Sequence, residues 1–380
     1  MNILTEFPFV ENIKFFGGAT YLVGGYVRDL LLGRESKDID LLVTGIPIDK
    51  IINILENYGK VDQVGKSFGV LKMRYKEYDL DIALPRTEIK TGEGHTGFEI
   101  VSDHNIPLIK DLERRDFTMN AIALDEYNRY IDPFGGIKDI VSKTIKAVSL
   151  DTFSDDPLRI LRSFQFSSRL DFSISSGTLS QIYKHKESLS QISGERIRVE
   201  LQKLVKGDKR DKVLRQMYTF GIIDKILAPY HFNSDFHAIT PNMIGSIASL
   251  VFTLCGFEYD EIISRKLKLS NEEERELQVL SLVYHNPFKT TIFHAAKKWK
   301  GIYATNFFER GKAKYAILEM NKGYFPKDQS EIDITSEQLM TQGYTGKQLG
   351  EAWYEIVSAI MLEKINNDEE EIIAYLKNNL

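Results

Sequence analysis

The apolar residues of the first 147 positions fall into short runs rich in β-branched side chains, which is the pattern of β-strands. Glycine-containing and helix-period segments separate these runs, which predicts a mixed α/β domain. From about residue 150 the period changes to that of long helices, as in 156–170 and 194–205, and few strand signals follow. The strands predicted in the first part lie at 21–23, 39–43, 70–75, 80–84 and 121–124.

Length and composition narrow the class of protein. A chain of 380 residues is too long for one small core, and two or three domains are expected. Cys255 is the single cysteine, which excludes an internal disulfide framework and a cysteine zinc site and suits the reducing cytoplasm. No apolar run approaches the roughly 18 residues of a membrane span, and a secretion signal is not expected. The net charge of −5 argues against an indiscriminate nucleic-acid coat but allows a basic groove.

The stretch YLVGGYVRDLLLGRESKDIDLLVTG (21–45) combines a glycine turn with two closely spaced aspartates. Gly24–Gly25 permit a tight turn after a strand, and residues 27–32 are predicted to form a short helix closed by Gly33. A helix start after a glycine turn presents free N–H groups to an anion, and Arg28 adds a positive charge there. Taken alone, the stretch is more often a plain tight turn, because it matches neither GxGxxG nor the P-loop pattern.

Asp38 and Asp40 stand one residue apart at the entry to a strand, so their carboxylates point to the same face. Two parallel carboxylates repel each other and need a cation, and Mg²⁺ bound through carboxylates and substrate phosphates fits. With Asp81 on a neighbouring strand, the acids predict a two-magnesium phosphoryl-transfer centre. Asp38 and Asp40 would bind the metal ions, and Asp81 would help to hold the ion that activates the attacking hydroxyl. Without other motifs, the first pair is equally consistent with solvated acids.

These acids belong to a series of segments that resembles, in order, the signatures of the class II tRNA nucleotidyltransferase and bacterial poly(A) polymerase family. The order of the series makes the resemblance specific. It covers about residues 20–205 and is weaker beyond, where GYTGKQLGEAW (343–353) looks like the C-terminal glycine loop of such enzymes. The matching segments are GGYVRD (24–29), DID (38–40), LDIALPRTE (80–88), RRDFTMNAIA (114–123), DPFGGIKDI (132–140), DDPLRILRSFQF (155–166) and GERIRVEL (194–201).

The resemblance implies an α+β fold with a defined order of domains. A nucleotidyltransferase-type mixed-sheet head is expected at 1–147. An all-helical neck that contains the base-selecting helix would follow at 148–212, and a helical body and tail that bind tRNA would occupy 213–380.

The resemblance also implies roles for matched residues of the head. Gly25 and Arg28 would hold the nucleoside triphosphate, and Arg115 would contact phosphate. Asp116 and Asn120 would bond the ribose 2′-OH and so favour ribonucleotides. Outside this series of motifs, the RRD run would be interpreted as a surface ion-pair cluster.

Base choice is expected in the segment DDPLRILR (155–162). Asp156, Arg159 and Arg162 are spaced three apart and are predicted to share one helical face next to the nucleotide. Enzymes of the family select the incoming base with the first pair. A carboxylate beside a guanidinium complements the amino donor and ring-nitrogen acceptor of cytosine and adenine, whereas uracil and guanine reverse that pattern. Otherwise the pair would be an ordinary i,i+3 salt bridge.

Two positions depart from the family pattern. Asp155 replaces the usual Glu, and this shorter acid is expected to be tolerated. Gln165 stands where a nucleotide-directed arginine is usual, so a positive charge is lost and no binding role is assigned to it. The polar stretch 86–100, which includes His95, resembles the flexible loop with which CCA-adding members switch from cytidine to adenosine, and it is compatible with an ordinary mobile surface loop.

Contacts with tRNA are expected in the helical part. The basic stretches 203–215 and 297–315, the second interleaved with aromatic residues, are candidates for binding the phosphates of an acceptor stem. Solvated basic helix faces explain them equally well. The candidate contact residues are Lys203, Lys206, Arg210, Lys297, Lys298 and Lys300.

The predicted function is therefore template-independent addition of CCA to the 3′ end of tRNA from CTP and ATP with Mg²⁺. The activity is expected in the cytoplasm, without a membrane or a stable protein partner. The loop length disfavours a CC-only enzyme, whereas an A-only enzyme stays open. A poly(A) polymerase of the same fold is a further rival, although 64–73 looks more like the tRNA enzymes. A catalytically inactive RNA-binding protein is the rival from another class, and the retained acids and base-selecting pair argue against it.

Overall fold

The computed structural model describes residues 3–64, 69–90, 98–227, 244–255, 260–304, 312–323 and 325–380. The chain divides into two compact units. The first comprises Met1–Ile192 and Gly207–Ile226, and the second comprises Ser193–Lys206 and Leu227–Leu380. The described residues of the second unit form helices and no strands, whereas the first unit carries a mixed sheet. The predicted α+β fold class is confirmed.

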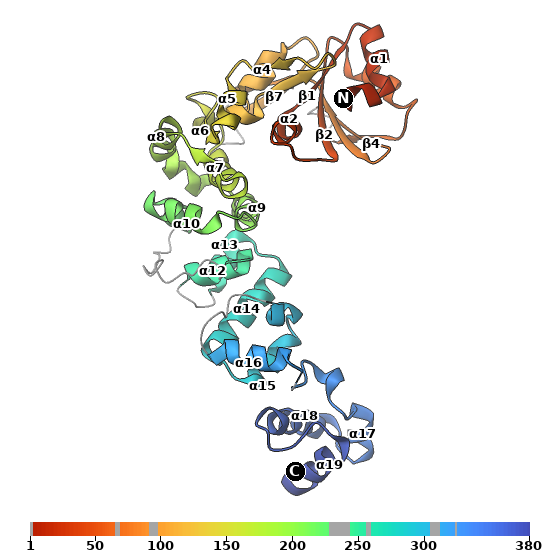
Figure 1. The fold of residues 1–380 in the computed structure, drawn as a ribbon, viewed down its shortest axis with the longest axis vertical. Helices are drawn as coiled ribbons and strands as arrows, with labels where there is room; N and C mark the ends of the chain where they lie inside the picture. The colour runs from red at the N-terminus through yellow and green to blue at the C-terminus, as the bar shows by residue number, and fades with distance from the viewer. Residues whose placement is uncertain are drawn as a thin grey trace. The chain divides into compact units, whose positions relative to one another are not determined.

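The first unit is built on a seven-stranded sheet with the order β3-β4-β5-β2-β1-β8-β9. Three strands of this sheet, β1, β2 and β4, are labelled in Figure 1. β2 and β5 run parallel, and the other neighbours in this sheet are antiparallel. The parallel pair therefore lies at the centre of the sheet. The strands are β1 (Ala19–Val23), β2 (Asp38–Thr44), β3 (Val61–Val64), β4 (Val70–Tyr75), β5 (Tyr78–Ala83), β8 (Ala123–Asp125) and β9 (Tyr130–Ile131).

Three helices pack on this sheet or on each other. α1 (Pro8–Phe15) contacts β1 and α3 (Ile48–Leu55), with Phe9 and Ile13 fully buried. α2 (Gly24–Leu31) follows β1 directly and packs on β1 and β2. The helix predicted at 27–32 thus begins earlier, at the first glycine of the turn.

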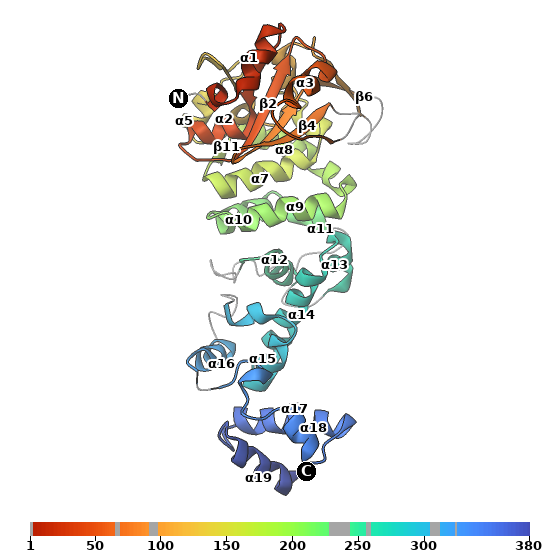
Figure 2. The same cartoon turned by 90° about the vertical axis from the view of Figure 1, so that its right-hand side faces the viewer.

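The rest of the first unit connects the sheet to a helical layer in which α7 and α10 lie side by side (Figure 2). Its strands are β6 (Arg86–Lys90), β7 (Phe98–Ser102), β10 (Thr144–Ile145) and β11 (Ser173–Ile174). Its α-helices are α4 (Leu108–Glu113), α5 (Gly136–Val141), α6 (Thr152–Asp155), α7 (Leu158–Leu170), α8 (Ser176–His185), α10 (Arg210–Thr219) and α11 (Ile222–Leu227), the last of which ends across the unit boundary. Its 3-10 helices are η1 (Ile3–Glu6), η2 (Thr118–Asn120) and η3 (Lys186–Gln191).

Two segments differ from their predicted form. The strand predicted at 121–124 is shorter and later, because residues 118–120 form η2 and β8 starts at Ala123. The stretch 86–100, predicted to be a loop, contributes the antiparallel strands β6 and β7. Residues 91–97 between these strands, with His95, lie outside the described residues.

The second unit is a stack of helices in which α9 packs on α12 and α13, and α18 packs on α17 and α19. Figure 2 shows the last three grouped at the C-terminus. No described helix is long and apolar enough to cross a membrane. The helices are α9 (Gly194–Val205), α12 (Ile247–Leu254), α13 (Glu261–Leu267), α14 (Asn271–His285), α15 (Lys289–Ala296), η5 (Lys300–Ala304), α16 (Lys312–Asn321), η6 (Gln329–Glu331), α17 (Ser336–Thr341), α18 (Gly346–Met361) and α19 (Glu369–Asn379).

Candidate active site

The three predicted catalytic acids lie on the two parallel central strands. Asp38 and Asp40 belong to β2, and Asp81 belongs to β5 in register with Asp40. Side chains alternate along a strand, so both β2 acids point away from the face on which Ile39 is buried. The fold thus brings together three carboxylates that are 43 positions apart at their widest along the chain (38 to 81).

The glycine turn that starts α2 lies against this acidic face. Gly24 has a φ of +70°, and a Cβ there would lie 2.9 Å from Arg115 Nη1 and 3.1 Å from Asp40 Oδ2. Glycine is therefore required at this position both by the left-handed backbone and by the close approach of two site side chains. The backbone N–H of Gly25 donates a hydrogen bond to the Asp40 carboxylate. The turn anchors the acid, in addition to presenting N–H groups.

Burial and the neighbouring carboxylates together raise the pKa of Asp40 above its ordinary value. Removal from water raises the pKa of Asp40, and the Arg115 guanidinium opposes this increase. The negative charges of Asp81 and Asp38 raise the pKa further. A divalent cation on this face would relieve the repulsion among the carboxylates.

The donor set fits an open magnesium site. The described residues contain no group of three or more His, Cys, Asp or Glu side chains placed to hold a metal ion by themselves. Asp81 Oδ1 lies 3.1 Å from Lys72 Nζ on β4, so this carboxylate already has a cationic partner. Mg²⁺ usually keeps several waters and binds one or two carboxylates plus substrate phosphates. Asp38 and Asp40 can supply those two carboxylates.

A buried polar network joins the RRD segment to α7. Asp116 Oδ2 accepts hydrogen bonds from Arg162 Nε at 2.8 Å and Nη2 at 2.7 Å. Asp116 Oδ1 accepts from Asn120 Nδ2 at 2.9 Å, and Asn120 Oδ1 accepts from Arg28 Nη1 at 2.8 Å. Burial alone would raise the pKa of Asp116, but the Arg162 guanidinium and the bond from Asn120 lower it. The network therefore holds a charged carboxylate at neutral pH.

Arg28 occupies an inner position in this network. It is 7% exposed, and Nε and Nη2 each donate to Asp29 at 2.9 Å. The centroid of the Phe166 ring lies 5.1 Å from the Arg28 guanidinium carbon and 5.3 Å from that of Arg162, within cation–π range of both. The guanidinium of Arg28 is thus tied to protein groups, and its contact with phosphate stays a prediction.

The predicted base-selecting residues lie at the start of α7. Arg159 Nη2 donates to the Arg114 carbonyl at 2.8 Å, and Nη1 donates to the Thr152 carbonyl at 3.3 Å. Asp156 precedes the helix in an extended conformation, and its Oδ1 accepts from the Leu158 N–H at 3.1 Å. The expectation that Asp156 shares a helical face with Arg159 is wrong, because the residue before a proline is disfavoured in the α conformation.

Two further positions in this region bear on the prediction. Gln165 is 1% exposed in α7, so its side chain belongs to the interior. Asp111, which the sequence analysis missed, is 0% exposed and binds both Arg114 and Arg115. The sequence spacing indicates these contacts, because Asp111 stands three residues before Arg114 and four before Arg115, and oppositely charged residues at these spacings form ion pairs on a helix.

The predicted RNA contacts are distributed over both units. Arg210 starts α10 in the first unit, while the lysine candidates lie in the second. Lys203 pairs with Glu200 at 2.8 Å. Lys206 and Lys297 are the C-cap residues of α9 and α15, where a cation also stabilises the helix terminus. The exposed candidates are Lys206, Lys297, Lys298 and Lys300.

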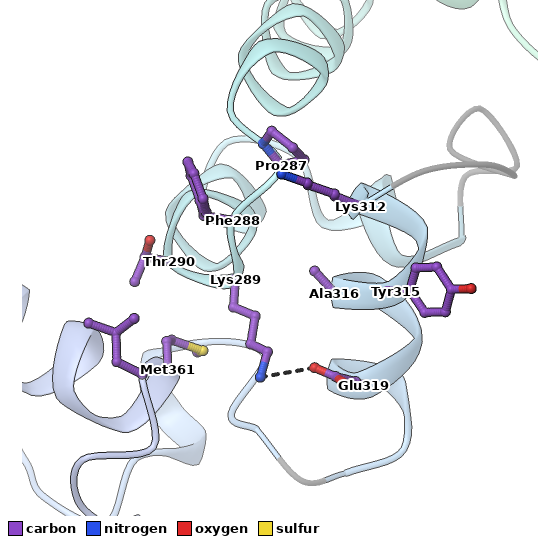
Figure 3. Close-up of a pocket in the computed structure, with 10 residues that line it drawn as sticks. Pro287, Phe288, Lys289, Thr290, Lys312, Tyr315, Ala316, Glu319 and Met361 are labelled. Carbon is purple, nitrogen blue, oxygen red and sulfur yellow. Dashed lines mark ion pairs between the residues drawn. The ribbon is translucent and has the colours of Figure 1, made fainter.

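The second unit also contains a pocket of about 320 Å³ between α15 and α16 (Figure 3). Lys312 and Tyr315, from the predicted basic and aromatic stretch 297–315, lie along it. Lys289 in its wall pairs with Glu319 at 2.9 Å, so the charge of this lysine is balanced within the pocket.

Two known protein families match parts of this chain. The family described as "Poly A polymerase head domain" matches residues 20–146, which contain the acidic face, the glycine turn and the RRD segment. A second family, described as "Probable RNA and SrmB- binding site of polymerase A", matches residues 171–233.

Individual relatives extend the similarity over the whole chain. A CCA-adding enzyme of Streptococcus suis (strain 05ZYH33) is 29% identical over 99% of this chain and 98% of its own length. A CCA-adding enzyme of Staphylococcus aureus (strain MRSA252) is 29% identical over 98% and 97%. The solved Bacillus stearothermophilus CCA-adding enzyme in complex with CTP shares the fold with a TM-score of 0.77 at 24% identity, over 100% of this chain and 98% of that one.

A mixed sheet that carries paired carboxylates beside a glycine turn is the fold of a nucleotidyltransferase head. The chain belongs to the class II tRNA nucleotidyltransferase and bacterial poly(A) polymerase family, and it is an enzyme of the nucleotidyltransferase class.

Proposed function

We propose that the chain adds CCA to the 3′ end of tRNA from CTP and ATP without a nucleic-acid template. The observation that carries the proposal is the face shared by Asp38, Asp40 and Asp81, against which the glycine turn and Arg115 pack. The full-length similarity to CCA-adding enzymes supports tRNA as the acceptor. Solved relatives in complex with CTP, with ATP and with tRNA support the same set of substrates.

The acidic face supports in-line phosphoryl transfer. Asp38 and Asp40 would hold Mg²⁺, which when bound stabilises the attacking and leaving oxygens. Asp81 would help to place the 3′-hydroxyl of the tRNA for attack on the α-phosphate, with pyrophosphate as the leaving group. Arg115 lies beside Asp40 and offers a positive charge to the phosphates of the nucleotide. The missing side chain at Gly24 leaves room for this arginine.

The network behind the acidic face supports recognition of the sugar. Asp116 and Asn120 would bond the ribose 2′-OH, because a charged carboxylate and an amide together offer an acceptor and a donor. The hydrogen bonds from Arg162 and Arg28 hold the two side chains in place before the nucleotide arrives. Preorganisation of this kind reduces the entropy lost on binding.

The start of α7 supports selection of the base. Arg159 is held by two backbone carbonyls, so its guanidinium is directed rather than free to rotate. Asp156, in the extended segment before the helix, would accept a hydrogen bond from the amino group of cytosine or adenine, while Arg159 would donate one to the ring nitrogen. Uracil and guanine would leave both partners unpaired, which disfavours them.

The helical second unit, with the exposed lysines of α9 and α15, would bind the tRNA phosphates. The domain order of head at 1–147, neck at 148–212, and body and tail at 213–380 belongs to this proposal. The activity is expected in the cytoplasm, where the lone cysteine stays reduced.

The test is incorporation into tRNA lacking its last three, two or one nucleotides, with CTP, ATP or both. Ordered addition of C, C and A that then stops would support the proposal. Addition of only the cytidines or only the adenosine would identify a partial enzyme, and long adenosine tails would identify a poly(A) polymerase. Binding of tRNA with no incorporation under any condition would contradict the enzyme activity and leave an RNA-binding protein.

A further inference from the structure

We propose that Asp111 is the positioning residue that holds Arg115 in place for the nucleotide phosphates and keeps it from closing onto the acidic face. The inference rests on the proposed function, because the phosphate contact of Arg115 is part of that function. Asp111 lies on α4 and is fully buried, and it binds the backbone N–H of Arg86 and the side chains of Arg114 and Arg115.

The carboxylate of Asp111 is shared between two arginines and the backbone. Its Oδ2 accepts from Arg115 Nη2 at 2.9 Å, and its Oδ1 accepts from Arg114 Nε at 2.9 Å. The Arg86 N–H, at the start of β6, donates to Oδ1 at 3.2 Å. Burial would raise the pKa of Asp111, but the charges of Arg115 and Arg114 lower it, so the group is ionised at neutral pH.

The charge balance of this cluster explains why the arrangement is useful. One buried carboxylate binds two guanidinium groups, so a net positive charge remains, and of these two groups Arg115 lies beside Asp40. Arg115 Nη1 lies 2.9 Å from the position of a Cβ on Gly24, next to Asp40 Oδ2 at 3.1 Å from the same point. Without Asp111, the flexible arginine would be free to pair with Asp40 directly and compete with the metal for it.

The same carboxylate also fixes the turn that carries Arg114. The carbonyl of Arg114 accepts a hydrogen bond from Arg159 at 2.8 Å. Asp111 thereby connects the phosphate-directed arginine to the arginine proposed to select the base. A group with this position is expected to influence nucleotide affinity without contacting the nucleotide.

The experiment is equilibrium binding of CTP with Mg²⁺ to the full chain, measured by calorimetry for the wild type, Asp111→Asn, Arg115→Ala and the double variant. Asp111→Asn keeps the shape of the side chain but removes its charge. The Kd for CTP is expected to rise about tenfold or more, which is the effect of losing one charge-assisted hydrogen bond between Arg115 and the nucleotide phosphates. The double variant is expected to bind CTP no more weakly than Arg115→Ala, because Asp111 acts through that arginine.

The matched control is Asp125→Asn at the β8–β9 turn. Asp125 is also buried and binds an i,i+4 arginine, Arg129, at 2.8 Å. This variant is expected to retain the wild-type affinity for CTP, although it loses a similar ion pair. If Asp111→Asn fails to fold, Asp111→Glu is compared with the wild type in its place. This variant keeps the charge but displaces Arg115, and it is expected to raise the Kd for CTP by a smaller factor.

The outcomes separate this inference from the proposed function. A wild type that binds CTP but incorporates nothing into tRNA would refute the function, while the binding comparison would still decide the role of Asp111. Equal CTP affinity of the wild type and both folded Asp111 variants would overturn the positioning role. So would a double variant in which the two losses simply add, because that result means that Asp111 acts independently of Arg115.

Discussion

Replacing Gly24 by alanine is expected to remove most of the nucleotidyl transfer while the protein stays folded. The φ of +70° at this position would place an alanine in the left-handed region, which costs about 1–2 kcal/mol. The new Cβ would also lie 2.9 Å from Arg115 Nη1 and 3.1 Å from Asp40 Oδ2. Arg115 is tied to Asp111 at 2.9 Å, so the strain is relieved only if site residues move.

The expected loss of activity follows from that displacement. A shift on the order of 1 Å in a catalytic group lowers the rate about 100-fold. Incorporation of labelled CTP into tRNA lacking its CCA end would measure the rate, and denaturant unfolding would measure stability.

Gly33→Ala is the matched control for the cost of placing alanine in the left-handed backbone conformation. Gly33 has a φ of +68°, and a Cβ there would meet no atom within 4 Å. Both variants should lose a similar amount of stability from the left-handed conformation, but only Gly24→Ala should lose activity. Equal activity in the two variants would refute the claim that the close approach of Arg115 and Asp40 requires glycine.

Three other predictions concern single residues of the site. Asp40→Ala should abolish incorporation and leave tRNA affinity, measured by filter binding, nearly unchanged; persistent activity would exclude a metal-binding role. Arg159→Ala should reduce the preference for CTP and ATP over UTP and GTP more than the rate with CTP, and unchanged selectivity in a competition assay would remove the base-selecting role. The pKa of Asp116 is lowered in the folded state, so its ionic contribution to stability is present near neutral pH and lost as the pH falls below about 4. The stability difference between the wild type and Asp116→Asn should therefore shrink in acid, and a difference independent of pH would contradict the ionised state of Asp116.

Much of the head could be predicted because the spacing of apolar and charged residues along the chain indicates the local secondary structure. The single residue between Asp38 and Asp40 is enough to predict that both carboxylates share a face, because the period of a strand is two. Short apolar runs likewise located β1, β2, β4 and β5 to within a few residues. The prediction that Asp156 belongs to the helix of DDPLRILR was wrong, because Asp156 is extended. The proline that follows it indicates this conformation, since the residue before a proline is disfavoured in the α region.

Other features of the site depend on contacts between distant segments. The burial of Asp111 follows from the packing of α4 on β6, and the inner position of Arg28 follows from the packing of α2 on the sheet and on η2. An exposed ion pair would have the same sequence spacing as Asp111 and its arginines. Asp111 is 0% exposed because two arginines satisfy it inside the head. Burial changes such a pair from a weak surface contact to an element that fixes side-chain geometry.

The sequence by itself predicted the candidate catalytic residues: two aspartates on one strand face, a third on another strand, and a glycine turn near them. Its ordered motifs also determined the family. Only the tertiary structure decided that β2 and β5 are parallel neighbours in register, which places Asp81 beside Asp40, and that Gly24 lies within contact of Arg115. The physical reason is that periodicity records which face a side chain takes, whereas the neighbour across that face is set by the packing of the whole sheet and its helices.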